Sequence, residues 1–182
     1  MYAILAEGRS YVNRSAFGIR SRLDTPTGRA IIDLFLPCRL KRMSRQPFEM
    51  VAHTADIGVL IRGRDIEELL VNAARGLYSI LLCATSPAER LERVVTVDSP
   101  DGDALLVDWL NELIYLFDAE RLAFSRFEFE HLTECRLQVR CFGEYIDTAR
   151  HKVVRDVKAA TYHEAHIQRV EDGYAVRVIL DV

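Results

Sequence analysis

Hydrophobic and polar residues alternate with clear periods from residue 47 onward. Short alternating or β-branched segments bounded by turn residues predict strands at 48–52, 57–61, 91–97, 124–132, 134–142, 156–166 and 175–181. Apolar residues that recur at spacings of three and four predict two amphipathic helices, one after Asp65 and one after the turn at 99–103. The chain therefore consists of strands and two helices in an irregular succession.

Each predicted helix carries one apolar face. Asp65 is placed to cap the first helix, and Glu68 completes an Asp-x-x-Glu capping pattern. The apolar face of the first helix contains Leu69, Leu70, Ala73, Ala74, Leu77, Ile80 and Leu81, and that of the second contains Leu106, Trp109, Leu110, Leu113, Ile114 and Phe117. Because both faces must be buried, we expect an α+β fold, a two-layer sandwich with the two main helices packed on one face of a mostly antiparallel or mixed β-sheet.

Length and composition predict one folded domain. The chain has 182 residues, 49% of them hydrophobic and 28% charged, which is enough for one core and too few for two full domains. Residues 1–42 carry eight Lys or Arg and three Asp or Glu, whereas the remaining residues carry sixteen and twenty-four. This acidic body argues against broad electrostatic capture of nucleic acid and suits a cation or a basic partner, although a solvated surface is the commoner explanation.

We divide the chain into an N-terminal extension, 1–46, and a single domain, 47–182. The extension shows no persistent helical or strand period, so our main interpretation is a disordered or loosely attached tail. Two alternatives stay open. One is an organellar transit peptide, which the arginines faintly suggest, and the other is translated upstream sequence with Met43 as the true start.

The four cysteines show no CxxC spacing and no histidine at zinc-finger distance. Cys135 and Cys141 have the same parity in a predicted strand, so we expect buried thiols in a reducing cytosol. No apolar run approaches the roughly 18 to 20 residues that span a bilayer, and the opening lacks the pattern of a secretory signal. We therefore expect a cytoplasmic protein.

Two distant carboxylates form the main candidate site. Asp56 lies in a short loop before the second predicted strand, and Asp181 ends the last strand beside Val182 and its terminal carboxylate. If the fold brings these groups together, they supply the oxygen ligands that calcium or magnesium requires. A solvated loop carboxylate is the alternative for Asp56. Lys158 lies in an otherwise apolar strand segment, where its ammonium needs a carboxylate or phosphate partner.

Two other groupings are weaker candidates. Asp108 and Glu112 share one face of the second helix, which suits acid–base chemistry but is more typical of a solvated face. The polar segment 143–147, with His151, is expected to be an ordinary turn rather than a catalytic loop. The sequence contains no Ser-His-Asp order, phosphate-binding loop or dinucleotide-binding fingerprint.

Five separated motifs together resemble the archease family. In chain order they are 53–59 (HTADIGV), 108–116 (DWLNELIYL), 143–144 (GE), 157–163 (VKAATYH) and 178–182 (VILDV). The resemblance runs from about residue 48 to the last residue and covers none of residues 1–42. One departure is Asp156, where the family pattern leads us to expect a glutamate.

The resemblance implies a function that composition does not show. Archeases are small metal-binding proteins that activate the RtcB-type RNA ligase, an enzyme of tRNA splicing and RNA repair, by promoting guanylylation of its active-site histidine. The implied cofactor is a divalent cation, with calcium expected and magnesium or manganese as alternatives. GTP and RNA are implied only through the ligase, with no membrane partner. The protein is then an activator and not itself an enzyme.

The resemblance also implies roles for single residues. Asp56 and Asp181 are the expected cation ligands, and Val182 contributes through its terminal carboxylate or backbone. Lys158 is the expected partner-facing residue, and His53 is expected to orient the Asp56 loop. Two other functions stay open, namely a general chaperone or modulator of RNA-modifying proteins and a stand-alone metal-dependent hydrolase.

Overall fold

The structure is a computed structural model that describes residues 46–52, 56–83 and 86–182. Residues 1–45 of the predicted extension lie outside the described residues, and so does His53. The interpretations offered for them stay predictions. Neither of the two helices in the described ranges is long and apolar enough to cross a membrane.

Two helices form where the apolar spacing predicts them. Helix α1 spans Ile66–Leu81, and helix α2 spans Gly102–Ala119. The predicted cap is confirmed, because the main-chain N–H of Glu68 donates to the Asp65 carboxylate at 2.8 Å. Asp101 caps α2 in the same way, accepting from the main-chain N–H of Ala104 at 2.8 Å.

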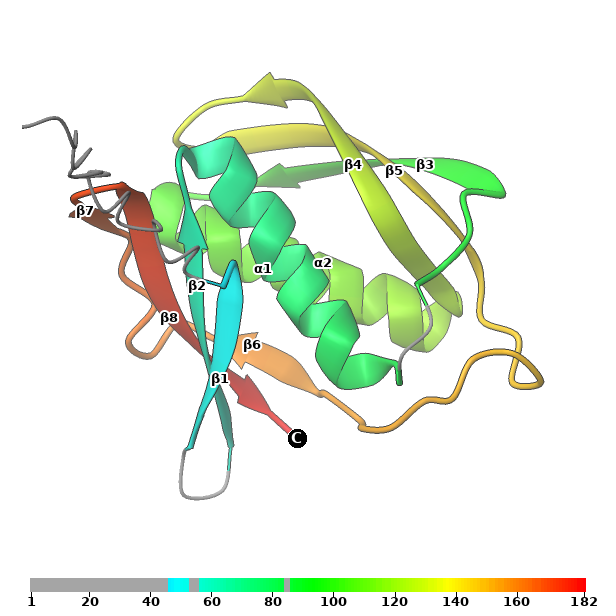
Figure 1. The fold of residues 1–182 in the computed structure, drawn as a ribbon. Helices are drawn as coiled ribbons and strands as arrows, with labels where there is room; N and C mark the ends of the chain where they lie inside the picture. Colours follow the sequence, from blue (N-terminus) through cyan, green and yellow to red (C-terminus); the bar gives the residue numbers. More distant parts are fainter. Residues whose placement is uncertain (1–45, 53–55, 84–85) are drawn as a thin grey trace, which may run out of the picture. The chain divides into compact units, whose positions relative to one another are not determined.

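The strands form two antiparallel sheets (Figure 1). The larger sheet has the order β1-β2-β8-β6, with β7 also paired to β8; its strands are β1 Phe48–Ala52, β2 Ile57–Gly63, β6 Ala159–Thr161, β7 Gln168–Val170 and β8 Gly173–Asp181. The smaller sheet has the order β3-β5-β4, from β3 Leu91–Asp98, β4 Leu122–Leu132 and β5 Arg136–Tyr145.

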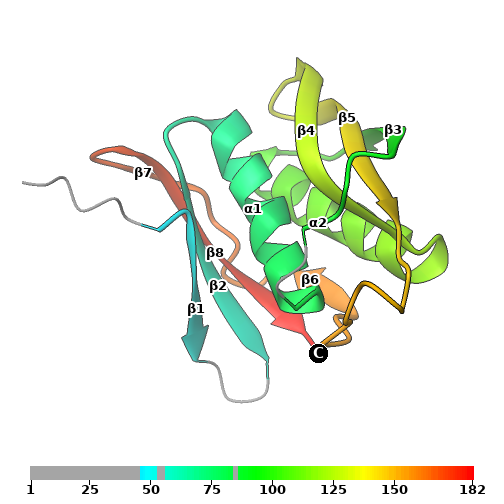
Figure 2. The same cartoon turned by 45° about the vertical axis from the view of Figure 1, so that its right-hand side comes forward.

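Both helices lie between the two sheets (Figures 1 and 2). Helix α1 contacts β2 and β4, and helix α2 contacts β6, β3 and β4. The α+β class and its two main helices on antiparallel strands are confirmed. The strands divide into two sheets where one was expected, because α2 buries Leu105, Val107 and Leu116 in addition to its predicted apolar face. A helix that is apolar on nearly every side needs a covering layer on each side.

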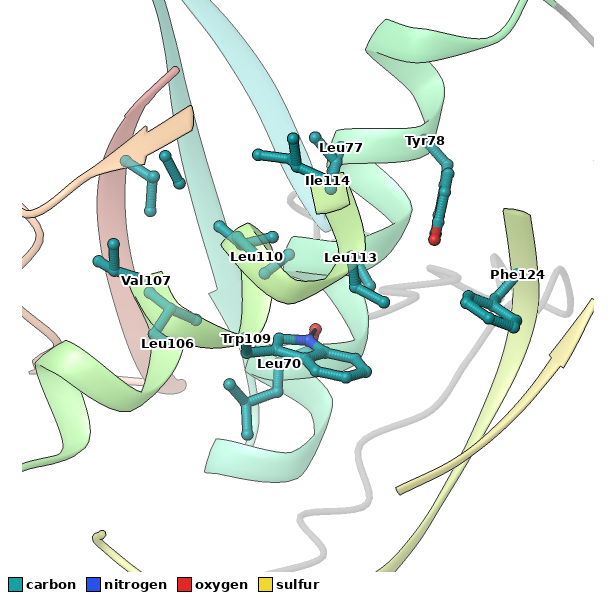
Figure 3. Close-up of a cluster of buried hydrophobic side chains, with 14 of the residues drawn as sticks. Leu70, Leu77, Tyr78, Leu106, Val107, Trp109, Leu110, Leu113, Ile114 and Phe124 are labelled. Atoms are coloured by element: carbon teal, nitrogen blue, oxygen red, sulfur yellow. Dashed lines mark hydrogen bonds between the residues drawn. The ribbon is translucent and has the colours of Figure 1, made fainter. Parts of the chain in front are cut away.

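Trp109 lies at the centre of the core. Its side chain is fully buried, and the indole N–H donates to the main-chain oxygen of Leu70 at 3.2 Å. The ring of Phe127 meets the indole edge-on, with ring centroids 5.8 Å apart. Figure 3 shows Trp109 among Leu70, Leu110 and Leu113, between the two helices and the smaller sheet. These contacts hold α2 against α1 and against β4 of the smaller sheet.

Three local predictions are wrong. The strand expected at 156–166 is reduced to β6, because the chain turns at 162–165 and Glu164 adopts a positive φ of 61°. The turn expected at 143–147 begins inside β5, which continues to Tyr145. Cys141 is buried as predicted, but Cys135 is exposed in the bend before β5, where the strand parity no longer applies.

Gly143 allows β4 and β5 to approach closely. A Cβ atom at this position would lie 1.9 Å from the main-chain oxygen of Ala123 and 2.8 Å from the Cα of Phe124. We expect Gly143→Ala to lower the free energy of unfolding by about 2 kcal/mol or more, because backbone atoms must move to make room. Urea unfolding followed by circular dichroism measures this change.

Gly102→Ala is the matched control for that measurement. Among the described residues, the only neighbour within 4 Å of a Cβ atom on Gly102, at the start of α2, would be the Glu134 main-chain oxygen at 3.9 Å. Alanine favours helix over glycine, so this variant should be as stable as the wild type or slightly more stable. Equal stability of the two alanine variants would contradict the close approach at Gly143.

Candidate functional site

The candidate site lies where three strands of the larger sheet end together. In the ladder between β2 and β8, Ile57 is opposite Leu180, and on the other side of β8 Ala159 is opposite Asp181. The start of β2, the end of β8 and the start of β6 therefore lie next to one another. Figure 1 shows β6 beside the end of β8, which is marked C.

This register brings the two predicted aspartates together. Asp56 directly precedes the Ile57–Leu180 pair, and Asp181 directly follows it. Asp181 is exposed and Asp56 is partly buried. We use the name strand-end site for Asp56, Asp181, Val182 and Lys158.

Lys158 is attached to the end of β8 by two contacts. Its main-chain N–H donates to the Asp181 main-chain oxygen at 2.9 Å. Its ammonium Nζ donates to the main-chain oxygen of Val182 at 3.1 Å. The ammonium group therefore lies at the end of β8, where it contacts the main chain of Val182.

The oxygen atoms of the strand-end site are suited to a hard cation. Asp56 and Asp181 supply carboxylates, and Val182 supplies a main-chain oxygen. Within the described ranges, no three His, Cys, Asp or Glu side chains gather in a group that could hold a metal ion. The site therefore provides a partial set of ligands, which suits a cation that keeps waters or shares the oxygens of a second molecule.

Asn111 fixes the short strand β6 against α2. Its amide nitrogen Nδ2 donates to the Ala160 main-chain oxygen at 3.1 Å, and its Oδ1 accepts from the Ala160 main-chain N–H at 2.8 Å. The amide side chain thus replaces the neighbouring strand that β6 lacks on this side. Because Lys158 lies just before β6, this contact also determines the position of Lys158.

Asp108 and Glu112 do not act as a pair. The Asp108 carboxylate accepts hydrogen bonds from the hydroxyl groups of Ser99 and Tyr162. The carboxylate raises the pKa of Tyr162, since it accepts the phenol hydrogen and repels a phenolate. Glu112 shares neither contact, so Asp108 is a structural acceptor that ties the residue after β6 to α2.

Glu144 forms a buried ion-pair cluster away from the strand-end site. Arg150 donates to both of its carboxylate oxygens at 2.9 Å, and the Ala88 main-chain N–H donates at 2.6 Å. Nε2 of the buried His151 lies 3.2 Å from the same carboxylate, and Nε of Arg90 lies 3.4 Å away. The Arg150 contacts, followed by the Ala88 N–H, hold the pKa of Glu144 at about 2, below its ordinary value of 4.5.

This cluster joins three parts of the chain. Glu144 belongs to β5, Ala88 precedes β3, and Arg150 lies in the long connection between β5 and β6. The segment 143–151 is therefore a structural anchor in this chain. Sequence reasoning placed it in a turn because its polar residues gave no sign that Glu144 and His151 are buried.

The fold and the strand-end site define a small α+β protein that presents carboxylates at the end of a central strand. The family model described as the Archease protein family matches residues 48–182. The chain belongs to the archease family.

Relatives and solved structures agree with this assignment. The archease proteins of Methanosarcina mazei and Thermococcus gammatolerans are 32% and 36% identical, in alignments that cover 74% and 69% of this chain and 95% and 91% of those proteins. The solution structure of Methanobacterium thermoautotrophicum protein 1598 has 33% identity and a TM-score of 0.64, and the match covers 75% of this chain and 99% of that one.

A second solved structure supports the fold alone. The crystal structure of a Thermotoga maritima archease, described as a possible chaperone, matches with a TM-score of 0.51 and 23% identity. That match covers 74% of this chain and 96% of that one.

We expect Asn111→Ala to free β6 from α2. The substitution leaves the Ala160 N–H and carbonyl without their partner, which should lower the free energy of unfolding by about 1–3 kcal/mol. Hydrogen exchange at the Ala160 amide, followed by NMR, should become faster than in the wild type. Glu112→Ala, on the next residue of α2, is the control and should leave this exchange rate unchanged.

The Glu144 cluster predicts a pH dependence of stability. A carboxylate whose pKa is lowered on folding stabilises the protein above its unfolded pKa, and this stabilisation is lost as the pH falls through the folded pKa. The contribution of Glu144 should therefore be complete above about pH 4.5 and disappear on acidification toward about pH 2. Arg150 and Arg90 are 39% and 67% exposed, so water weakens their share of this effect.

The variant Glu144→Gln tests this dependence by urea unfolding at several pH values. At pH 7 it should be less stable than the wild type by roughly 2 kcal/mol. The difference between the two proteins should shrink as the pH falls from about 4.5 toward 2. Glu171→Gln, in the exposed turn before β8, should follow the wild type throughout, and a pH-independent difference for Glu144→Gln would refute the assignment.

Proposed function

We propose that this protein is a cytoplasmic activator of an RtcB-type RNA ligase, which promotes guanylylation of the ligase histidine and so supports multiple turnover. Membership of the archease family supports this proposal. The observation that carries the proposal is the β2–β8 register, because it places Asp56 beside Asp181 at the end of the sheet. Asp181 is exposed and Asp56 is partly exposed at this end of the sheet.

Asp56, Asp181 and the main-chain oxygen of Val182 are the residues we assign to a divalent cation, calcium first and magnesium or manganese as alternatives. When bound, the cation would supply charge neutralisation and orientation for the phosphates of a nucleotide in the ligase. The partial set of protein oxygens fits this role, since the remaining ligands can come from water and phosphate.

Lys158 has a positioning role in this proposal. Its ammonium donates to the Val182 main-chain oxygen at 3.1 Å, next in the chain to Asp181. The same group can donate to a phosphate once the site meets a nucleotide. The nucleophile of the reaction belongs to the ligase, so the activator needs no catalytic residue of its own.

Asp181→Asn and Asp56→Asn test the proposal directly. We expect the wild type to raise the multiple-turnover rate of the cognate ligase with GTP and a divalent metal. In each variant the stimulation of the rate should be smaller by roughly tenfold or more, because an amide is a poorer cation ligand than a carboxylate. The measurement is the rate of RNA joining with the ligase at a concentration well below that of the RNA.

Asp98→Asn is the matched control, since it removes a carboxylate that pairs with Arg136 at the edge of the smaller sheet. It should stimulate the ligase like the wild type. Unfolding curves of all variants should coincide with that of the wild type. Full stimulation by a folded Asp56→Asn, Asp181→Asn double variant would refute the cation assignment. A wild type that does not stimulate the ligase would refute the proposed function.

A further inference from the structure

Helix α2 leaves one strip of its surface uncovered. Most of the helix is buried between the two sheets, but residues at spacings of three and four along one side stay partly or fully exposed. We call these residues the α2 stripe: Asp108, Asn111, Glu112, Tyr115 and Asp118. The stripe runs along the side of α2 that carries β6, and it ends near the strand-end site.

An open groove joins the stripe to the strand-end site. It has a volume of about 610 Å³ and lies between the second half of α2 and the start of β6. The groove is lined by Asn111, Ile114, Tyr115, Asp118, Ala119, Lys158 and Ala159. A molecule that occupies this groove therefore touches both the helix and the lysine that contacts the end of β8.

Two carboxylates of the stripe, those of Glu112 and Asp118, lack the ion-pair partners seen on the smaller sheet. There, exposed carboxylates face arginines in ion pairs, such as Arg140 with Glu92 at 2.8 Å and Arg136 with Asp98 at 3.0 Å. Among the described residues, the carboxylates of Glu112 and Asp118 make no such pair and no hydrogen bond. The stripe therefore presents negative charge that is available to a partner.

Two tyrosines flank these carboxylates. Tyr115 is 56% exposed in the middle of the stripe, and Tyr162 is 59% exposed beside its beginning. The hydroxyl of Tyr162 donates to Asp108, which fixes the ring on α2. Tyrosine is enriched at protein interfaces because it offers a large, rigid contact area with few rotatable bonds.

We propose that the α2 stripe, with its groove and Tyr162, docks on a basic, phosphate-binding surface of the ligase. This inference rests on the proposed function, because it takes the ligase as the partner. A protein that binds GTP and RNA must present lysine and arginine around the phosphates. The stripe carries the complementary charge, and its groove continues to Lys158, so docking would bring Asp181 to the nucleotide.

Two variants separate docking from activation. Tyr115→Ala removes the aromatic contact, and Glu112→Lys reverses one charge of the stripe. Each should weaken binding to the cognate ligase at least tenfold, as expected for the loss of a central interface contact. The concentration of activator that gives half-maximal stimulation should rise by the same factor, while the maximal stimulation stays close to that of the wild type.

The salt dependence of binding measures the electrostatic contribution to the affinity for the ligase. Affinity of the wild type should fall as the ionic strength rises, because salt screens the contact between acidic and basic surfaces. Glu112→Lys should show a shallower dependence, whereas Tyr115→Ala should keep the wild-type slope. The controls are Glu171→Lys, in the turn before β8, and Val94→Ala, an apolar side chain that is 49% exposed on β3.

The outcomes distinguish this inference from the proposed function. Wild-type stimulation with unchanged binding by both stripe variants would overturn the docking surface and leave the activator function intact. A lower maximal stimulation at unchanged half-maximal concentration would also overturn it, because the stripe would then act on the chemical step. A wild type that neither binds nor stimulates the ligase would overturn both proposals.

Discussion

The pairing of β8 on both of its edges is the constraint on which the candidate site depends. β8 lies between β2 on one side and β6 and β7 on the other, so its register determines which residues meet at the end of the sheet. A shift of one residue would turn Val176, Val178 and Leu180 from the core to the opposite face. Burial of these apolar side chains therefore fixes the register, and the register places Asp181 beside Asp56.

The connection between β5 and β6 needs separate support, since it contains no regular strand or helix over most of its length. Hydrogen bonds tie it to the end of α1, where Val154 donates to the Leu81 oxygen at 2.9 Å and Lys152 accepts from the Cys83 N–H at 3.0 Å. The Glu144 cluster holds its beginning, and Asn111 holds β6 at its end. Together these contacts determine the position of Lys158.

The sequence predicted more of the fold than of the site. Apolar spacing located both helices, and the Asp65 cap is where the capping pattern put it, because these signals depend on residues close together in the chain. The second sheet that covers α2 was not predicted, since the apolar face taken from the sequence did not include Leu105, Val107 and Leu116. Asn111, Tyr162 and Glu144 act through partners 49, 54 and 56 residues away, a separation that no local pattern reveals.

The exposed carboxylates of the smaller sheet and those of the α2 stripe differ in their partners. This difference supports a role of the α2 stripe in binding another protein. On the smaller sheet, arginines face the exposed carboxylates across strands, an arrangement that relieves repulsion within the folded protein. On α2, the carboxylates of Glu112 and Asp118 make no ion pair among the described residues, although an arginine at one turn's distance would have stabilised the helix. The unpaired carboxylates add no such stabilisation, and two exposed tyrosines lie beside them. Binding of a positively charged partner explains this surface better than a contribution to stability does.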